Sequence, residues 1–232
     1  MKFDVLIVGG GHNGLVCGAY LAKRGLSVGI IEHKRVVGGC VVTEQVSKGW
    51  NINTYSFEHY VIQNTPIVSD LSLSKFGLRY YPVEPTIFSP FKDGKKMFFH
   101  RNLAKTLDRI SDLSRRDSKS YERFHTKWSR VSKAIGRAAL QKPAPLEHIL
   151  KPEYAPSERK DLIEEMKLAA AKILAETFET EYVSSPIAFL GPAAVGQDPS
   201  AEGTGWLLSW HIGAENLARP FGGSGQLSRA LE

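Results

Sequence analysis

The chain has 232 residues, of which 42% are hydrophobic and 23% charged, and its formal net charge is +6. These proportions are typical of a globular protein and argue against an intrinsically disordered chain. The only two cysteines, Cys17 and Cys40, are not spaced as metal ligands. Their small number argues against a disulfide framework and is typical of a protein in a reducing compartment. The uncharged stretch 5–22 holds five glycines besides His12 and Asn13, so it predicts neither a signal peptide nor a membrane span. We therefore expect a cytoplasmic protein.

The first 31 residues predict a strand, a glycine-rich turn, a helix and a second strand. Residues 5–8 are an uninterrupted aliphatic run, typical of a parallel strand that is buried on both faces. Apolar positions then repeat at helical spacing over 15–24 and end at Gly25, and a second buried strand is predicted over 27–31. This order is that of an α/β protein with a Rossmann-like βαβ start.

The glycine-rich turn predicts a dinucleotide site. Gly9 allows a tight exit from the strand, Gly11 lets the backbone approach the phosphates, and Gly14 permits close helix–strand packing. A pyrophosphate would lie at the helix N-terminus, where unpaired N–H groups stabilise an anion. Glu32 follows Gly14 by 18 residues, close to the separation of about 20 at which an acidic residue binds a ribose hydroxyl, and its charge disfavours NADP. The alternative is an ordinary βαβ turn without a ligand.

A second glycine pair, Gly38 and Gly39, places further backbone amides where they can face a pyrophosphate. With this pair, the chain resembles the FAD-binding entry segment of amine oxidases and carotenoid desaturases, and most of all the phytoene-desaturase-type oxidoreductases. The motifs that carry the resemblance are residues 9–16, 38–44, 49–50, 73–78, 203–205 and 222–231. The resemblance implies that FAD is the cofactor and that it is bound by Gly9, Gly11, His12, Asn13, Gly14, Glu32, His33, Gly38, Gly39 and Cys40. Dithiol chemistry is not expected, because the residue five positions after Cys40 is Gln45.

The resemblance also implies a division into domains. Residues 1–60 are predicted to be the N-terminal part of an FAD-binding domain, 61–218 an α+β substrate region, and 219–232 a glycine-rich loop and helix that return to the FAD domain. No buried strand with its own crossover helix follows Ile31, so the Rossmann-like half is incomplete. We therefore expect the N-terminal half of a flavoprotein, which needs a complementary C-terminal polypeptide to hold FAD tightly.

The middle of the chain alternates between strand and helix signals. A helix is predicted over 66–76 with a stop at Gly77, and strands are predicted over 78–83, 86–91 and 97–100, with a hairpin turn at Asp93 and Gly94. Together these elements imply a β-sheet that is shared with helices. Further helices are predicted over 103–114, 118–140, 158–178 with Ser157 as the N-cap, 185–190 and 205–213. Basic residues are concentrated in this region, but interleaved acidic residues favour a solvated helical face. Contact with an anionic membrane surface is the second interpretation, and nucleic acid is not expected because no stacking platform accompanies the charge.

Three further groups are candidates for a role near the flavin. Thr54, Tyr55, Ser56 and His59 lie either beneath the flavin ring or simply in a packed loop. Trp206, Trp210 and His211 form either an aromatic wall or, as we favour, part of a core helix. The loop 220–225 is predicted to approach flavin or substrate rather than to be a surface linker. No catalytic base is assigned, and no metal site is expected.

The predicted function is FAD-dependent dehydrogenation or desaturation, in which a hydride passes from a hydrophobic substrate to flavin. The relatives imply either an isoprenoid substrate or a C–N bond. Two alternatives remain: a non-catalytic lipid or prenyl binder similar to the Rab GDP-dissociation inhibitors, and an NAD-dependent dehydrogenase. The glycine fingerprint and Glu32 favour nucleotide binding over the first alternative, and the second glycine pair counts against the second.

Overall fold

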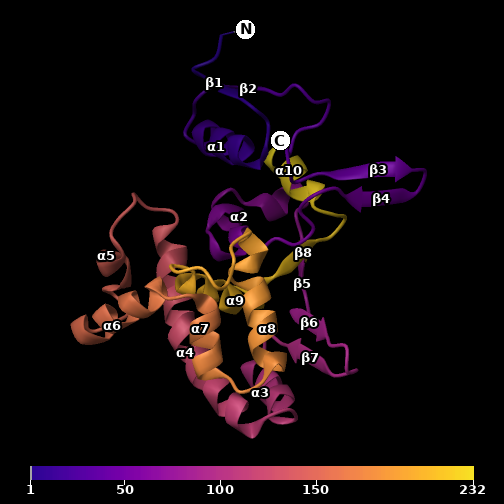
Figure 1. Cartoon of the computed structure of the whole chain (residues 1–232). Coiled ribbons are helices and arrows are strands. Elements are labelled where there is room, and N and C mark those ends of the chain that lie inside the picture. The colour runs from indigo at the N-terminus through magenta and orange to yellow at the C-terminus, as the bar shows by residue number, and fades with distance from the viewer. Residues whose placement is uncertain (1) are drawn as a thin grey trace. The chain divides into compact units, whose positions relative to one another are not determined.

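The computed structural model describes residues 2–232, which divide into two compact units. The first unit comprises the chain up to Val83 together with Leu217–Glu232, and the second comprises Glu84–Asn216. Figure 1 labels the helices and strands of both. Residues 61–83 thus pack in the first unit, with the glycine-rich turns.

The first unit begins with the strand β1 (Val5–Val8), the helix α1 (His12–Lys23) and the strand β2 (Val28–Ile31). β1 and β2 are parallel, and Val5 lies opposite Val28. Beyond α1, Gly25 adopts a left-handed conformation with φ +88°, as expected where a helix ends. The predicted βαβ start of a Rossmann-like α/β fold is therefore confirmed.

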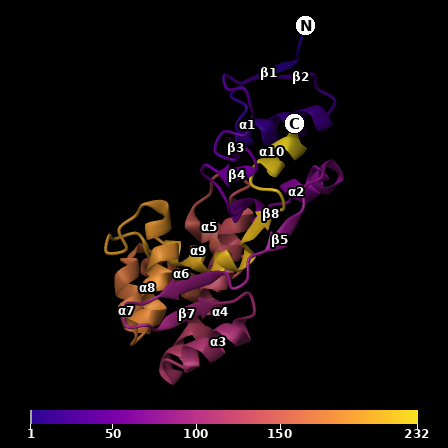
Figure 2. The ribbon, with the colours of Figure 1, turned by 90° about the vertical axis from the view of Figure 1, so that its right-hand side faces the viewer.

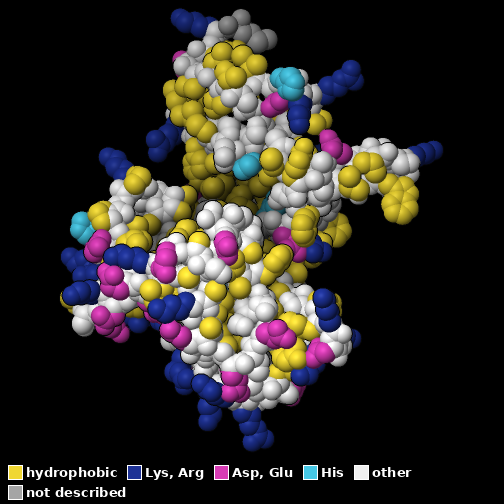
Figure 3. Space-filling model, in the orientation of Figure 1, with side chains coloured by type: hydrophobic (Ala, Val, Ile, Leu, Met, Phe, Trp, Pro, Cys, Tyr) yellow, Lys and Arg dark blue, Asp and Glu magenta, His cyan; other side chains and the backbone are white. Residues whose placement is uncertain are grey.

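The prediction that these strands are buried on both faces is wrong. Leu6, Val8 and Ile31 are 54%, 82% and 52% exposed. Alternate side chains of a strand point to opposite faces, and α1 covers only the face that carries Ile7. In the described residues this sheet has two strands, and Leu6, Val8 and Ile31 lie at the surface on its other face. Figure 3 shows hydrophobic side chains at the surface over β1 and β2.

A hairpin and short helical turns follow. The strands β3 (Thr43–Ser47) and β4 (Trp50–Asn53) pair antiparallel, with an irregularity between Gln45 and Ser47. The predicted helix over 66–76 is broken into α2 (Ile67–Asp70) and a 3-10 turn over Leu73–Phe76, after a first 3-10 turn over Val61–Asn64. The break lies at Ser72, whose φ of 52° is left-handed and incompatible with a continuous helix.

The C-terminal residues complete the core of the first unit. The strand β5 (Tyr80–Pro82) pairs antiparallel with β8 (Ala218–Pro220), and the helix α10 (Gly225–Leu231) follows. Figures 1 and 2 both show α10 beside α1. Their contact belongs to one hydrophobic cluster, whose buried members are Leu15, Val41, Leu71, Leu73, Leu78, Leu227, Ala230 and Leu231.

The second unit is mainly helical. Its strands β6 (Ile87–Pro90) and β7 (Lys96–Phe99) form the predicted hairpin, whose turn contains Gly94 with φ +85°. The three predicted strands do not form one sheet, because β5 pairs with β8 in the first unit. The helices are α3 (Leu103–Ser111), α4 (Arg115–Ala138), α5 (Leu146–Leu150), α6 (Pro156–Lys167), α7 (Ala170–Thr177), α8 (Glu181–Leu190) and α9 (Leu208–Gly213).

The predicted single helix over 158–178 is instead the pair α6 and α7. Its N-cap is Ala155 rather than Ser157, because Pro156 occupies the first helical position and Glu158 accepts a hydrogen bond from the Ala155 N–H at 3.2 Å. The first helix ends at Leu168, whose carbonyl accepts a hydrogen bond from the Gly205 N–H at 2.9 Å. A segment distant in sequence thus replaces the helical bonds at the break.

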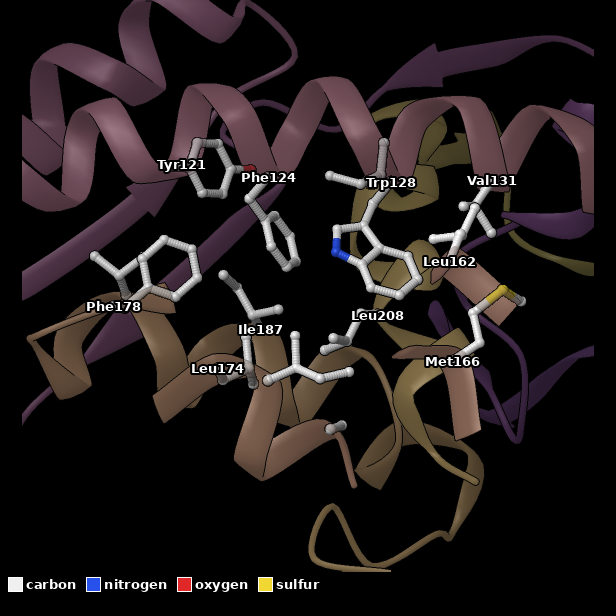
Figure 4. Packing of buried hydrophobic residues seen from close by; sticks show 14 of the residues in the cluster. Tyr121, Phe124, Trp128, Val131, Leu162, Met166, Leu174, Phe178, Ile187 and Leu208 are labelled. Carbon is white, nitrogen blue, oxygen red and sulfur yellow. The ribbon is translucent and has the colours of Figure 1, made fainter. Parts of the chain in front are cut away.

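The core of the second unit is built on α4 (Figure 4). Tyr121, Phe124, Trp128 and Val131 recur at helical spacing, and all four are buried. They face apolar side chains from α7, α8 and α9, including Leu174, Ile187 and Leu208. No helix within residues 2–232 is long and apolar enough to cross a membrane.

Candidate dinucleotide-binding site

The first glycine turn connects β1 to the N-terminus of α1. Gly9 has φ +102°, a conformation that favours glycine, and its N–H donates to the Ile31 carbonyl at 2.8 Å. The helix begins when the Leu15 N–H donates to the Gly11 carbonyl at 2.9 Å. The N–H groups of His12 and Asn13 belong to the first helical turn, which has no intrahelical acceptors for them. The turn therefore presents backbone donors that can bind an anion.

The glycines of this turn have different reasons to lack a side chain. A Cβ on Gly14 would lie 2.3 Å from the Gly9 carbonyl oxygen, so packing within the chain requires glycine there. A Cβ on Gly11 would meet, apart from its chain neighbours and among residues 2–232, nothing closer than the Gly39 Cα at 3.9 Å. Space beside Gly11 is what close approach of a phosphate needs, and the turn therefore fits a dinucleotide.

Glu32 lies against the same turn. Its Oε2 accepts a hydrogen bond from the Gly10 N–H at 2.8 Å, and its Oε1 accepts one from the Lys34 N–H at 2.9 Å. These bonds, that of Lys34 first, hold the pKa of the Glu32 carboxyl below its ordinary value. The ionised carboxylate can also accept hydrogen bonds from a ribose hydroxyl. The exposed His33 ring lies 3.9 Å from the Glu32 carboxylate.

The second glycine pair touches the first turn. The Gly38 N–H donates to the Gly10 carbonyl at 2.7 Å, and a Cβ on Gly39 would lie 3.1 Å from the Gly11 Cα. Gly38 and Gly39 have φ values of +123° and +61°. The structure therefore brings both glycine turns and Glu32 together, while Cys40 follows as an exposed thiol.

Comparison with known proteins agrees with this geometry. Residues 7–66 match the family described as "NAD(P)-binding Rossmann-like domain". The chain begins with a Rossmann-like dinucleotide-binding segment.

The whole chain is similar to curated oxidoreductases. Pyridine nucleotide-disulfide oxidoreductase domain-containing protein 2 of Rattus norvegicus is 26% identical over 264 residues, which cover 99% of this chain and 45% of that protein. One of the subunits of limonene dehydrogenase from Castellaniella defragrans is 27% identical over 99% of this chain and 42% of its own length. The chain thus spans less than half the length of these relatives.

Solved structures show the same fold. Putrescine oxidase bound to putrescine matches with a TM-score of 0.61 at 18% identity, covering 100% of this chain and 49% of the oxidase. Rab GDI of Plasmodium falciparum matches with a TM-score of 0.55 at 14% identity, covering 99% of this chain and 55% of its own. One fold therefore occurs in proteins named as an oxidase and as a GDI.

Polar residues far along the chain also contact the dinucleotide-binding segment. The Ser228 hydroxyl of α10 donates to the Val41 carbonyl at 2.6 Å, next to the second glycine pair. The Thr43 hydroxyl accepts a hydrogen bond from the Gly225 N–H at 2.9 Å. Sequence reasoning assigned no role to Ser228 or Thr43, although both lie in motifs that carried the resemblance, 222–231 and 38–44.

His59 is a buried connector in the first unit. Its Nδ1 lies 2.7 Å from the Tyr80 hydroxyl, and its Nε2 lies 2.7 Å from the Ser224 hydroxyl. Burial, with a smaller contribution from His12, lowers the pKa of His59 to about 4, and burial raises the pKa of Tyr80. His59 is therefore a neutral ring with hydroxyl groups at both nitrogens. In the same loop, Thr54 donates to the Glu44 carboxylate on β3 and the Tyr55 side chain is exposed.

The aromatic group around His211 lies in the core of the second unit. The His211 Nε2 is 2.9 Å from the Tyr121 hydroxyl, and its ring meets Phe99 edge-on with centroids 4.7 Å apart. Burial, with a smaller contribution from His125, lowers the pKa of His211 to about 3. Trp206 packs against the same cluster. The favoured interpretation of His211 and Trp206 as core residues is confirmed.

Proposed function

We propose that this chain forms the dinucleotide-binding part of an FAD-dependent oxidoreductase of the phytoene-desaturase type. One observation carries the proposal: the open space beside Gly11 lies on the same turn to which the ionised Glu32 is bonded. The helix N-terminus suits the pyrophosphate, and the carboxylate suits the adenosine ribose. The His12 and Asn13 N–H groups would hold the pyrophosphate without a basic side chain.

FAD is proposed rather than NAD because of the second glycine pair. Gly38 and Gly39 place a second stretch of backbone against Gly10 and Gly11, so that two glycine turns rather than one border the pyrophosphate site. Similarity to a putrescine oxidase fold supports the same choice. FAD, when bound, supplies a hydride acceptor, while the residues of this chain bind and orient it.

The proposed substrate is hydrophobic. The relative named for limonene supports this proposal, because limonene is an apolar hydrocarbon. The oxidase solved with putrescine supports a C–N bond as the second candidate. No residue is assigned as a proton acceptor for either reaction.

We further propose that a complementary polypeptide covers the open face of the β1–β2 sheet. Leu6, Val8 and Ile31 expose large apolar side chains there, and covering such surface is favourable by about 25 cal/mol per Å². The relatives are more than twice as long as the stretch they share with this chain, and the limonene dehydrogenase relative is itself one component of a larger enzyme by its name. The proposed partner corresponds to the remaining length of these relatives.

The test is the absorbance spectrum and the FAD-to-protein ratio of the purified chain, alone and after co-expression with such a polypeptide. We expect weak FAD binding by the chain alone and a stoichiometric complex with the partner. Absence of FAD from both preparations would overturn the proposed function. A stoichiometric complex of the chain alone would overturn only the need for a partner.

A non-catalytic binder is the second candidate, because the chain also matches the fold of a Rab GDI. Such a protein would carry a prenyl or other lipid group without turnover. Retention of Gly9, Gly11, Gly14 and Glu32 in one compact arrangement favours the oxidoreductase. Binding of a geranylgeranylated peptide by a chain that binds no dinucleotide would reverse this preference.

A further inference from the structure

The second glycine turn is in direct contact with a hydroxyl from the C-terminal helix. Ser228 of α10 is 2% exposed, and its Oγ donates to the Val41 carbonyl at 2.6 Å. A Cβ on Gly38 would lie only 2.6 Å from the same Oγ. The hydroxyl therefore fits closely against a backbone turn that only glycine can form.

This contact continues through a series of hydrogen bonds to the acidic residue. The Val41 N–H donates to the Gly38 carbonyl at 2.9 Å, and the Gly38 N–H donates to the Gly10 carbonyl at 2.7 Å. The Gly10 N–H in turn donates to the Glu32 carboxylate at 2.8 Å. Ser228 thus stands at one end of a series that includes both glycine turns and Glu32.

A second polar cluster holds the loop that precedes α10. The Thr43 hydroxyl accepts from the Gly225 N–H at 2.9 Å and donates to the Asn53 side-chain oxygen at 2.8 Å. The same oxygen accepts from the Ser224 N–H at 2.9 Å. The approach is so close that a Cβ on Gly223 would lie 2.4 Å from the Thr43 hydroxyl oxygen. The loop is therefore fixed to both strands of the β3–β4 hairpin.

Two more contacts anchor the same segment. The Ser224 hydroxyl lies 2.7 Å from the His59 ring, and Leu227 and Leu231 share a buried cluster with Leu15 of α1. Hydrogen bonds and buried apolar contacts thus hold the same segment. A buried hydrogen-bond network of this kind favours one conformation of the segment.

We infer that the segment 222–231, here called the latch, holds the second glycine turn in its dinucleotide-binding shape, and that Ser228 is its key positioning residue. This inference rests on the proposed function and adds residues that the glycine fingerprint does not contain. Ser228 acts through the backbone of Val41 and Gly38. Its loss would free the turn to leave its positive-φ conformation and would weaken dinucleotide binding without altering any donor of the first turn.

The experiment compares Ser228→Ala with the matched control Ser209→Ala in the whole chain. Ser209 is also 2% exposed, and its hydroxyl also donates to a backbone carbonyl, that of Trp206 at 2.8 Å, but it lies in the second unit. Flavin fluorescence titration gives the Kd for FAD, and hydrogen exchange without ligand reports on the amides of Gly38 and Val41. We expect Ser228→Ala to raise the Kd about tenfold and to accelerate exchange of these two amides. Ser209→Ala should change neither.

The outcomes separate the two proposals. If the wild-type chain binds FAD and Ser228→Ala binds it equally well, the latch is refuted while the proposed function stands. If the wild-type chain binds no FAD either alone or after co-expression with the complementary polypeptide, the proposed function fails, and the positioning role fails with it. An equal loss in Ser209→Ala would show general destabilisation and would also refute the latch. If Ser228→Ala does not fold, Thr43→Val is used instead, because it removes the hydroxyl that holds the loop before α10. This variant must also raise the Kd for FAD.

Discussion

Gly11→Ala separates ligand binding from folding more sharply than any other change in the first glycine turn. Apart from the neighbouring residues of the chain, the described residue nearest to the added methyl group is Gly39, whose Cα would lie 3.9 Å away, and the φ of −68° at Gly11 is open to alanine. Alanine is a poorer N-cap than glycine, but it also reduces the entropy of the unfolded chain, and each effect is at most about 1 kcal/mol. These effects oppose each other, so we expect a free energy of unfolding within about 1 kcal/mol of the wild-type value.

Dinucleotide binding should respond very differently. The methyl group would occupy the space that a pyrophosphate needs in order to reach the N–H groups of α1, so we expect the Kd for FAD to rise at least about tenfold. Gly14→Ala provides the contrast. Its methyl group would lie 2.3 Å from the Gly9 carbonyl oxygen, and this overpacking should destabilise the first unit by about 1–3 kcal/mol.

The assay is urea unfolding combined with FAD titration for both variants. Gly136→Ala is the control, because Gly136 lies in α4 with open space around its Cβ position. That change should stabilise the chain by about 0.5–1 kcal/mol and leave FAD binding unchanged. Wild-type affinity in Gly11→Ala, or a loss of stability as large as that in Gly14→Ala, would refute the reasoning.

Three further predictions concern single side chains. Glu32→Gln removes a charge-assisted acceptor and should weaken FAD binding by about 1.5–3 kcal/mol in a calorimetric titration; unchanged affinity would remove Glu32 from the site. His59 has a pKa of about 4 in the folded chain and an ordinary pKa of 6.5, so the unfolded state gains its proton first as the pH falls. Stability should therefore decrease between about pH 6.5 and pH 4, by up to about 3 kcal/mol from this group, and urea unfolding of His59→Gln should show a smaller decrease. Trp128→Ala should cost about 3–5 kcal/mol of stability. Trp128→Phe should cost less, because it keeps a ring and removes an indole N–H that has no hydrogen-bond partner in residues 2–232; equal losses would contradict this.

Features set by a few consecutive residues could be predicted from the sequence. The stop of α1 at Gly25 and the hairpin turn at Gly94 both use positive φ angles, which few residues other than glycine adopt readily. The βαβ order followed from the change in hydrophobic periodicity between residues 5–8 and α1. These are local properties, and they were confirmed.

Features set by distant contacts could not be predicted. The prediction of a continuous helix over 158–178 was wrong, because the helix ends at Leu168, whose carbonyl accepts a hydrogen bond from the Gly205 N–H. The prediction that β1 and β2 are buried on both faces was wrong, because a run of aliphatic residues indicates a strand but does not reveal how many of its faces are covered. Pairing of β5 with β8 joins residues more than a hundred positions apart, and periodicity carries no information about such a partner.

The same division applies to the candidate site. The first turn is encoded locally, since Gly9, Gly11 and Gly14 lie within six consecutive residues. Ser228 and Val41 are 187 positions apart, and a serine in an ordinary helix gives no signal of such a contact. The residue whose type reflects this distant packing is instead Gly223, where a Cβ would lie 2.4 Å from the Thr43 hydroxyl oxygen. A glycine pair before a helix can therefore indicate that a distant segment packs closely against it, as well as indicating a turn. Here the pair lies in the latch.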